Sequence, residues 1–185
     1  MNDQTPIKAP VFSLPQDELL TLNVGDIPVM RDALGPGIHF QPLLLDPELC
    51  LAVNIATFAP GAVVPAHLHT GAVHGFTLKG KWYYKEYADQ PQTAGSYLYE
   101  PASSIHTFVV PKDNTEDTVV LFVVYGANIS FDDKGNFHSI LDAITIMNLV
   151  KLCSERQGID SVRYLKGGSV GYSSKLVSDG ATMPV

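Results

Sequence analysis

Short apolar segments alternate with turn residues along the first two thirds of the chain. About nine of them have the length and alternation of β-strands, and they cover 27–31, 38–45, 49–58, 63–69, 73–79, 81–88, 96–100, 105–111 and 118–125. Gly80 separates two of these segments, at a point where a hairpin turn needs a residue that tolerates positive φ. So many short strands predict a mainly β sandwich or barrel, with its core over about 27–132.

The apolar spacing becomes helical after residue 138. Ser139 and Asp142 resemble a capping box, apolar residues recur from Ile140 onward, and Gly158 ends the pattern. We therefore expect an amphipathic helix over 139–157 that packs on the strands. An irregular Gly- and Ser-rich tail is expected over 159–185, so that residues 1–185 form a single domain.

The net charge of the chain bears on which kinds of molecule it can bind. The chain has 12 Lys and Arg against 19 Asp and Glu, a formal net charge of −7, which argues against nucleic acid as a partner. Only 17% of its residues are charged, compared with about one quarter in average globular proteins. Part of the surface therefore lacks polar covering, and we expect a homodimer that buries sheet edges against a second copy.

The expected location is the cytoplasm. Cys50 and Cys153 lie far apart in the sequence, which favours two free thiols over a disulfide. The N-terminus has no basic region followed by an apolar run, so no secretory signal is predicted. No stretch is long and apolar enough to cross a membrane, so a membrane partner is not expected.

Four of the six histidines fall between residues 67 and 106. The two-residue spacing of His67 and His69 puts both imidazoles on one face of a strand. His74 begins the next strand, and His106 lies on a later one. Imidazoles that meet inside a barrel are costly unless something binds them, and neutral histidine is a common ligand of divalent metals. His67, His69 and His106 are thus the predicted metal ligands.

Two motifs in this region resemble those of the cupin superfamily. They are Gly61-x5-His67-x-His69-x4-His74-x5-Gly80 and Gly95-x5-Pro101-x4-His106. The resemblance covers about residues 45–126 and implies a single cupin fold, a jelly-roll barrel (double-stranded β-helix) with a metal site, followed here by a C-terminal helix. This chain has His74 where the first motif usually has Glu, Ser103 where the second usually has Gly, and Val110 where it often has Asn.

A narrower resemblance covers 73–87, 94–101 and 106–111. These segments are similar to the 2,4′-dihydroxyacetophenone dioxygenase-like cupins, relatives of acetylacetone dioxygenase. The resemblance implies Fe(II) held by three histidines with a Glu nearby, and Glu86 is the matching residue. Period-two alternation from Trp82 lets Glu86 point inward, and a solvated position is the other interpretation. His74 competes with Glu86 as fourth ligand or catalytic base, whereas Glu100, next to Pro101, is interpreted as a turn residue.

The function expected from this resemblance is a non-haem Fe(II) dioxygenase. It would use O2 to cleave a carbon–carbon bond of a small hydroxyketone or diketone, an aromatic one by the closer resemblance. Zn, Mn or Ni in the same site would instead support an isomerase, lyase or hydrolase. A cupin that binds a small ligand without catalysis is the third possibility.

Overall fold

The computed structural model describes residues 20–167. Its strands are β1 (Ile38–Asp46), β2 (Leu51–Phe58), β3 (Val63–His69), β4 (Val73–Lys79), β5 (Lys81–Tyr84), β6 (Gln92–Thr93), β7 (Tyr97–Glu100), β8 (Ile105–Val109), β9 (Thr118–Tyr125), β10 (Asn128–Phe131), β11 (Phe137–Leu141) and β12 (Leu165–Lys166). Within the described range they form two six-stranded sheets. Sheet A has the order β12-β1-β2-β9-β4-β7 and sheet B the order β11-β10-β3-β8-β5-β6. The mainly β, jelly-roll prediction is confirmed.

Two of the predicted segments differ from the structure, and one hairpin was not predicted. Residues 27–31 form no strand, and only Met30 bridges to Phe40. The strand expected over 81–88 ends at Tyr84 and continues as the 3-10 turn η2 (Lys85–Tyr87); another 3-10 turn, η1 (Val24–Asp26), precedes β1. β10 and β11 were not predicted, and they pair as a hairpin next to β3.

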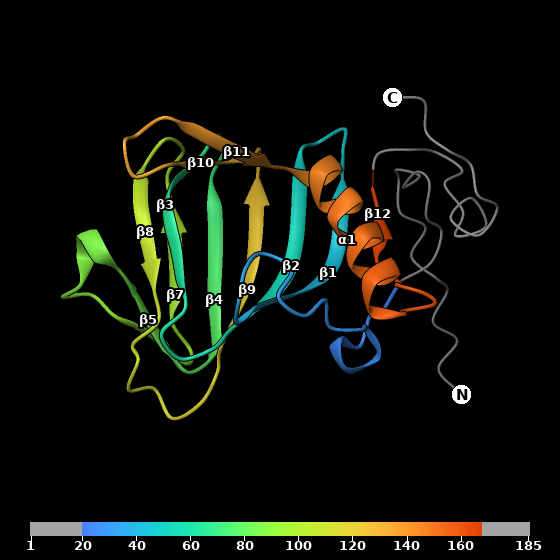
Figure 1. Cartoon of the computed structure of the whole chain (residues 1–185), viewed down its shortest axis with the longest axis horizontal. Coiled ribbons are helices and arrows are strands. Elements are labelled where there is room, and N and C mark those ends of the chain that lie inside the picture. Colours follow the sequence, from blue (N-terminus) through green and yellow to red (C-terminus); the bar gives the residue numbers. More distant parts are fainter. Residues whose placement is uncertain (1–19, 168–185) are drawn as a thin grey trace, which may run out of the picture. The chain divides into compact units, whose positions relative to one another are not determined.

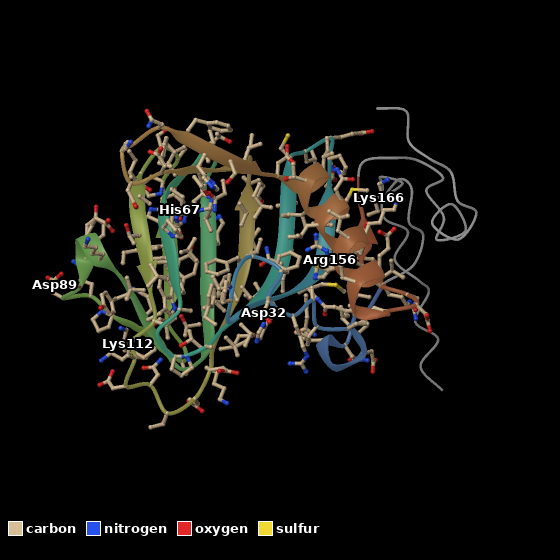
Figure 2. All side chains as sticks on the ribbon, viewed as in Figure 1. Asp32, His67, Asp89, Lys112, Arg156 and Lys166 are labelled. Carbon is tan, nitrogen blue, oxygen red and sulfur yellow. The ribbon has the colours of Figure 1, made fainter. Side chains whose placement is uncertain are left out.

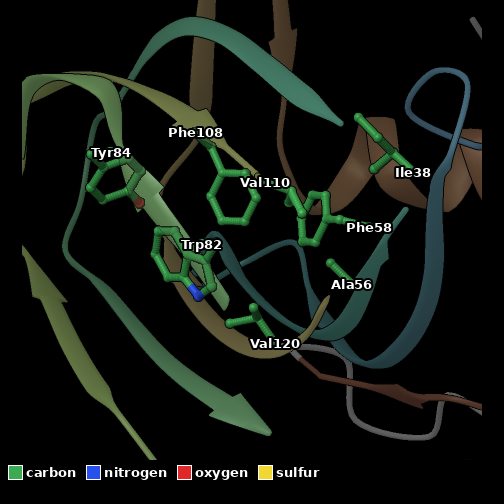
Figure 3. Packing of buried hydrophobic residues seen from close by; sticks show 8 residues of the cluster. All are labelled: Ile38, Ala56, Phe58, Trp82, Tyr84, Phe108, Val110 and Val120. Carbon is green, nitrogen blue, oxygen red and sulfur yellow. The ribbon is translucent and has the colours of Figure 1, made fainter. Parts of the chain in front are cut away.

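The core between the sheets follows the alternation of the strands. Trp82 is fully buried and stacks on Phe108, with ring centroids 4.3 Å apart. Its Nε1 donates a hydrogen bond of 2.9 Å to Oγ1 of Thr77, so the buried indole leaves no unpaired donor. Figure 3 shows this cluster. Tyr84 belongs to it and places a polar hydroxyl group in the interior.

The helix α1 (Ala143–Gln157) begins four residues later than predicted. Asp142 is its N-cap: the Asp142 carboxylate accepts from the backbone N–H of Thr145, and Oγ1 of Thr145 accepts from the N–H of Asp142. Ser139, the expected cap, lies in β11 instead. The predicted end is confirmed, because Gly158 has the left-handed conformation of a helix C-cap.

Packing of α1 against β1 builds a second apolar cluster beside the sheets (Figure 1). The residues after the helix are not irregular throughout, since β12 pairs in parallel with β1. The rest of the predicted tail, from residue 168 on, lies outside the described residues, and the single-domain assignment stays a prediction. No helix among the described residues has the length and apolar character needed to cross a membrane.

Gly80 and Ser103 are two of the turn positions with positive φ. Gly80 has φ 77° between β4 and β5, as predicted, and a Cβ there would lie 2.6 Å from Oγ1 of Thr118. Ser103 has φ 68° in the turn before β8, where the related motif has glycine. Its N–H donates a 2.7 Å hydrogen bond to the carbonyl of His69, which ties this turn to the end of β3. The left-handed conformation costs a non-glycine residue about 1–2 kcal/mol.

We predict that Ser103→Gly raises the free energy of unfolding by about 0.5–1 kcal/mol, because it removes this strain but adds some entropy to the unfolded chain. Urea unfolding of the metal-free protein measures the change. Ser104→Gly is the matched control: Ser104 has no positive φ, and its hydroxyl bonds to the carbonyl of Pro101, so that variant should be less stable than the wild type. Equal or lower stability of Ser103→Gly would contradict the prediction.

Candidate metal centre

Three histidines converge from two neighbouring strands of sheet B. His67 and His69 are two residues apart on β3, so both side chains lie on its inner face. His106 on β8 lies directly opposite His67 in the antiparallel register. All three are buried, with 2–7% of their surface exposed. One ring nitrogen of each can act as ligand, and these three atoms lie within 4.8 Å of one another. Figure 2 shows His67 on β3. On its other side β3 pairs with β10, where Ser130 lies opposite His67 and Asn128 opposite His69.

Glu100 joins the cluster from the facing sheet. It is the last residue of β7 and is 3% exposed. Its Oε2 lies 3.4 Å from Nε2 of His69 and 3.2 Å from Nε2 of His106. Tyr84 donates a hydrogen bond to the other oxygen, Oε1, and its ring packs on that of His106 with centroids 4.2 Å apart. The Tyr84 bond thus fixes the carboxylate with one oxygen turned to the histidines.

The hydrogen bonds around the cluster leave several ring and carboxylate atoms without a partner, close to one another. Nδ1 of His67 lies 2.7 Å from the carbonyl of Pro65, which selects the tautomer with the proton on Nδ1 and a free lone pair on Nε2. Nε2 of His106 and Oε2 of Glu100 are buried without a hydrogen-bond partner. Such atoms are rare in native proteins, and a divalent cation held by the three imidazoles would take up the lone pair of His106 beside the Glu100 carboxylate. The residues present therefore fit a metal ion.

Burial sets the protonation of the cluster. It lowers the pKa of His69 to about 4, from an ordinary value of 6.5, and it also lowers the pKa of His67. Burial alone would raise the pKa of Glu100, but the nearby His106 and His69 imidazoles and the Tyr84 hydroxyl together lower it. Burial and Glu100 raise the pKa of Tyr84, so its hydroxyl keeps the proton that it donates. Neutral imidazoles beside an ionised carboxylate are the state in which metals bind.

A cavity of about 110 Å³ lies against the cluster. Most of its walls are carbon, including the rings of Phe58, Phe108 and Phe122, and the start of α1 contributes to its lining. Asn54 and Asn128 add two amide groups, and Oδ1 of Asn128 is buried without a partner. The arrangement can hold a small molecule with an apolar body whose oxygen atoms reach His67, His69 and Glu100.

The structure brings together His67, His69 and His106 but leaves out the other two predicted site residues. Of the two interpretations of Glu86, an inward and a solvated position, the structure shows the solvated one: Glu86 lies in η2, is exposed, and both its oxygens accept hydrogen bonds from Thr107. His74 lies on the outer face of β4, with Nδ1 2.8 Å from the hydroxyl of Tyr97. Neither side chain lines the cavity.

The carboxylate that reaches the cluster, Glu100, was interpreted as a turn residue. Its signal was present in the alternation of β7, where Tyr97 and Tyr99 face out while Leu98 and Glu100 face in. Placing an acidic residue on the buried face of a strand costs free energy unless its carboxylate has polar partners there. Glu100 lies on the same face of β7 as Leu98. This position, rather than its closeness to Pro101, indicated that its carboxylate points into the interior.

Comparisons with known proteins agree on the fold. A cupin-like protein of unknown function from Ralstonia eutropha JMP134 is 40% identical, with 86% of this chain and 99% of that chain covered and a TM-score of 0.78. A second cupin from the same organism is 28% identical over 81% of this chain and 95% of that chain, with a TM-score of 0.74. An acetylacetone dioxygenase from Acinetobacter johnsonii shares the fold at 17% identity, covering 80% of this chain and 99% of that one with a TM-score of 0.65.

The curated proteins compared with the chain include no match. The family model of the ChrR cupin-like domain matches residues 22–128, which include His67, His69, Glu100 and His106. The match spans more than half of the chain, and the two sheets and the histidine cluster lie where the cupin motifs predicted them. The protein belongs to the family of ChrR cupin-like domains, within the cupin superfamily.

Proposed function

We propose that this protein is a non-haem Fe(II) dioxygenase that uses O2 to cleave a carbon–carbon bond of a small diketone or hydroxyketone. The observation that carries the proposal is the cluster of three buried imidazoles and one carboxylate, of which His67, His69 and Glu100 line a largely apolar cavity. The resemblance to acetylacetone dioxygenase-like cupins supports it, and the fold shared with the enzyme from Acinetobacter johnsonii is consistent with it.

The proposed metal ligands are His67, His69 and His106, each through a ring nitrogen, with Glu100 next to them. Bound Fe(II) would supply the Lewis acidity that acidifies a chelating ketone and the electron transfer that activates O2. His67 is held in its binding tautomer by the carbonyl of Pro65. The apolar walls would keep water from the reacting atoms, which strengthens every charge interaction inside the cavity.

Glu100 is the proposed proton acceptor. The lowered pKa keeps its carboxylate ionised, and Tyr84 holds Oε1, so that Oε2 is the atom available to a substrate. A ketone that binds beside the histidines would lose its enol or hydroxyl proton to Oε2 of Glu100. This assignment replaces Glu86 and His74, which lie outside the cavity.

The cavity limits the size of the substrate. An engineered cavity of about 150 Å³ binds benzene, and the cavity here measures about 110 Å³. A ketone with few carbon atoms therefore fits better than an aromatic hydroxyketone, for which the cavity would have to widen. Asn54 and Asn128 can hydrogen-bond a second oxygen of such a substrate.

A cytoplasmic location is part of the proposal. Both cysteines are free, with Cys50 exposed and Cys153 buried. Free thiols persist in a reducing compartment, and the same conditions favour ferrous iron.

Oxygen uptake tests the reaction. The iron-loaded protein should consume O2 with a small aliphatic diketone and more slowly with an aromatic hydroxyketone, and it should lose all turnover under argon. Turnover that persists without O2, or with Zn in place of Fe, would overturn the dioxygenase and favour a Lewis-acid enzyme. Ketone binding without any turnover, followed by titration calorimetry, would favour a ligand-binding cupin and overturn it as well.

Metal content tests the ligands. We predict that His67→Ala, His69→Ala and His106→Ala each reduce bound metal from about one ion per chain to a small fraction, because loss of a histidine ligand removes most of the affinity of such a site. Elemental analysis after purification gives the stoichiometry. His74→Ala is the matched control and should retain the metal; unchanged occupancy in all three ligand variants would rule out the site.

Paired Glu variants test the proton acceptor. Glu100→Gln keeps the shape and the bond from Tyr84 but removes the charge, so kcat should fall by about 100-fold or more. Glu86→Gln changes an exposed residue and should leave kcat within about two-fold of wild type. Steady-state oxygen uptake measures both, with metal content determined in parallel. A larger loss in Glu86→Gln than in Glu100→Gln would reverse the assignment.

The neutral imidazoles predict a pH dependence of stability. The unfolded chain binds protons below pH 6.5, whereas folded His69 binds its proton only near pH 4. The unfolded state therefore holds more protons in this window, and the free energy of unfolding of the metal-free protein should fall as the pH drops from 6.5 to 4. Urea midpoints across this range measure it.

The matched controls are two Gln variants. His69→Gln removes the buried imidazole and should flatten the pH dependence, while His138→Gln changes an exposed histidine and should preserve it. A midpoint that stays constant or rises on acidification of the wild type would show that the cluster is not buried in its neutral form.

A further inference from the structure

Sheet A carries an exposed aromatic surface on its outer side. We define this outer aromatic face by residues of β4, β7 and β9, which are His74, Phe76, Leu78, Tyr97, Tyr99 and Tyr125. Five of them are large apolar or aromatic side chains that are each 42–56% exposed. Scattered exposed apolar residues are ordinary in a soluble protein, but a contiguous group marks a contact surface.

The strand register makes this surface continuous around His74 and Phe76, whereas Leu78 lies at a β-bulge. His74 is paired with Tyr99 on one side and Val123 on the other, and Phe76 is paired with Tyr97 and Leu121. Residues directly opposite each other in antiparallel strands share a face. The ring centroids of His74 and Tyr99 are 5.6 Å apart and those of Phe76 and Tyr97 are 5.1 Å apart. Two cross-strand rows of side chains therefore lie next to each other.

The area of this surface is close to what a stable interface needs. A whole aromatic side chain has about 150–250 Å² of surface, so five large side chains that are half exposed present roughly 500 Å². The partly buried Leu121 and Val123 extend it across β9. The largest apolar patch of a monomer measures about 300–600 Å², and a standard interface buries about 800 Å² on each partner. The patch thus accounts for most of one side of a standard interface.

The chemistry of the outer aromatic face suits a copy of itself. None of the six defining side chains is acidic, Lys or Arg, so two copies can meet there although each chain carries a net charge of −7. Nδ1 of His74 already pairs with the hydroxyl of Tyr97, which means that covering these two atoms leaves no unpaired polar group between them. The nearest charged side chain along β4, Lys79, is paired with Glu116. A strongly charged partner would find no complementary charge here.

We propose that a second copy of this chain covers the outer aromatic face, so that the β4–β7 surfaces of two protomers pack across a two-fold axis. The chain is poor in charge as a whole, and the outer aromatic face is a connected aromatic surface that the described residues expose. The contact uses a sheet face, whereas the sequence had suggested sheet edges. The dimer does not depend on which reaction the cavity supports.

Sedimentation equilibrium and light scattering test the dimer. Wild type should have about twice the 20.0-kDa mass of one chain at micromolar concentration. Tyr97→Lys combined with Tyr99→Lys places like charges in the contact and should raise the dimer dissociation constant by about 100-fold or more. The matched control is Tyr87→Lys, because Tyr87 is 54% exposed but lies in η2, outside the outer aromatic face.

Circular dichroism and thermal melting show whether each variant remains folded, and Tyr99→Phe should remain dimeric because it keeps the aromatic ring. A monomeric wild type would overturn the proposal and leave the outer aromatic face to another partner. The proposal would equally fail if the double Lys variant dissociated no more than Tyr87→Lys.

Discussion

The cost of burying three imidazoles and a carboxylate in an apolar interior is the constraint on which the rest of this structure depends. Such groups lose their hydration, and each needs a fixed partner in return. Pro65 provides a carbonyl for His67, and Tyr84 provides a hydroxyl for Glu100. Among the buried atoms that remain without hydrogen-bond partners, Nε2 of His106 is one that a metal would bind, and Oε2 of Glu100 lies next to it. Buried atoms without partners destabilise the metal-free protein, and the same atoms are available to bind a cation.

Both sheets are required to assemble this cluster. The histidines come from β3 and β8 of sheet B, whereas Glu100 comes from β7 of sheet A. The apolar core between the sheets, centred on Trp82 and Phe108, sets the distance across which they face each other. Tyr84 belongs to that core and also bonds to Glu100, so the packing and the polar site share a residue. A substitution in the core would therefore be expected to disturb the carboxylate as well as the stability.

The predictable part of the fold and site is the part governed by regular alternation. The spacing of His67 and His69 indicated one face of a strand, and the structure places both there beside His106. The prediction for Glu86 extended that alternation past Tyr84, where the strand turns into a 3-10 segment. The helix start was missed for a related reason, because residues 137–141 pair with β10 in a hairpin, and the long-range pairing of β10 with β3 favours that hairpin over a local capping pattern. Tertiary partners of this kind are not visible in local sequence.

One short strand joins the interior of the protein to its surface. β7 is the last strand of sheet A, and among the described residues it is hydrogen-bonded to β4 alone. Tyr97 and Tyr99 face outward from it, while Glu100 points into the cavity. A molecule that presses on the two tyrosines restrains the same four residues of backbone that hold the carboxylate. In the proposed dimer, the contact at these tyrosines would therefore be coupled mechanically to the position of Glu100, and by reciprocity a ligand that draws Glu100 inward would change the strength of that contact.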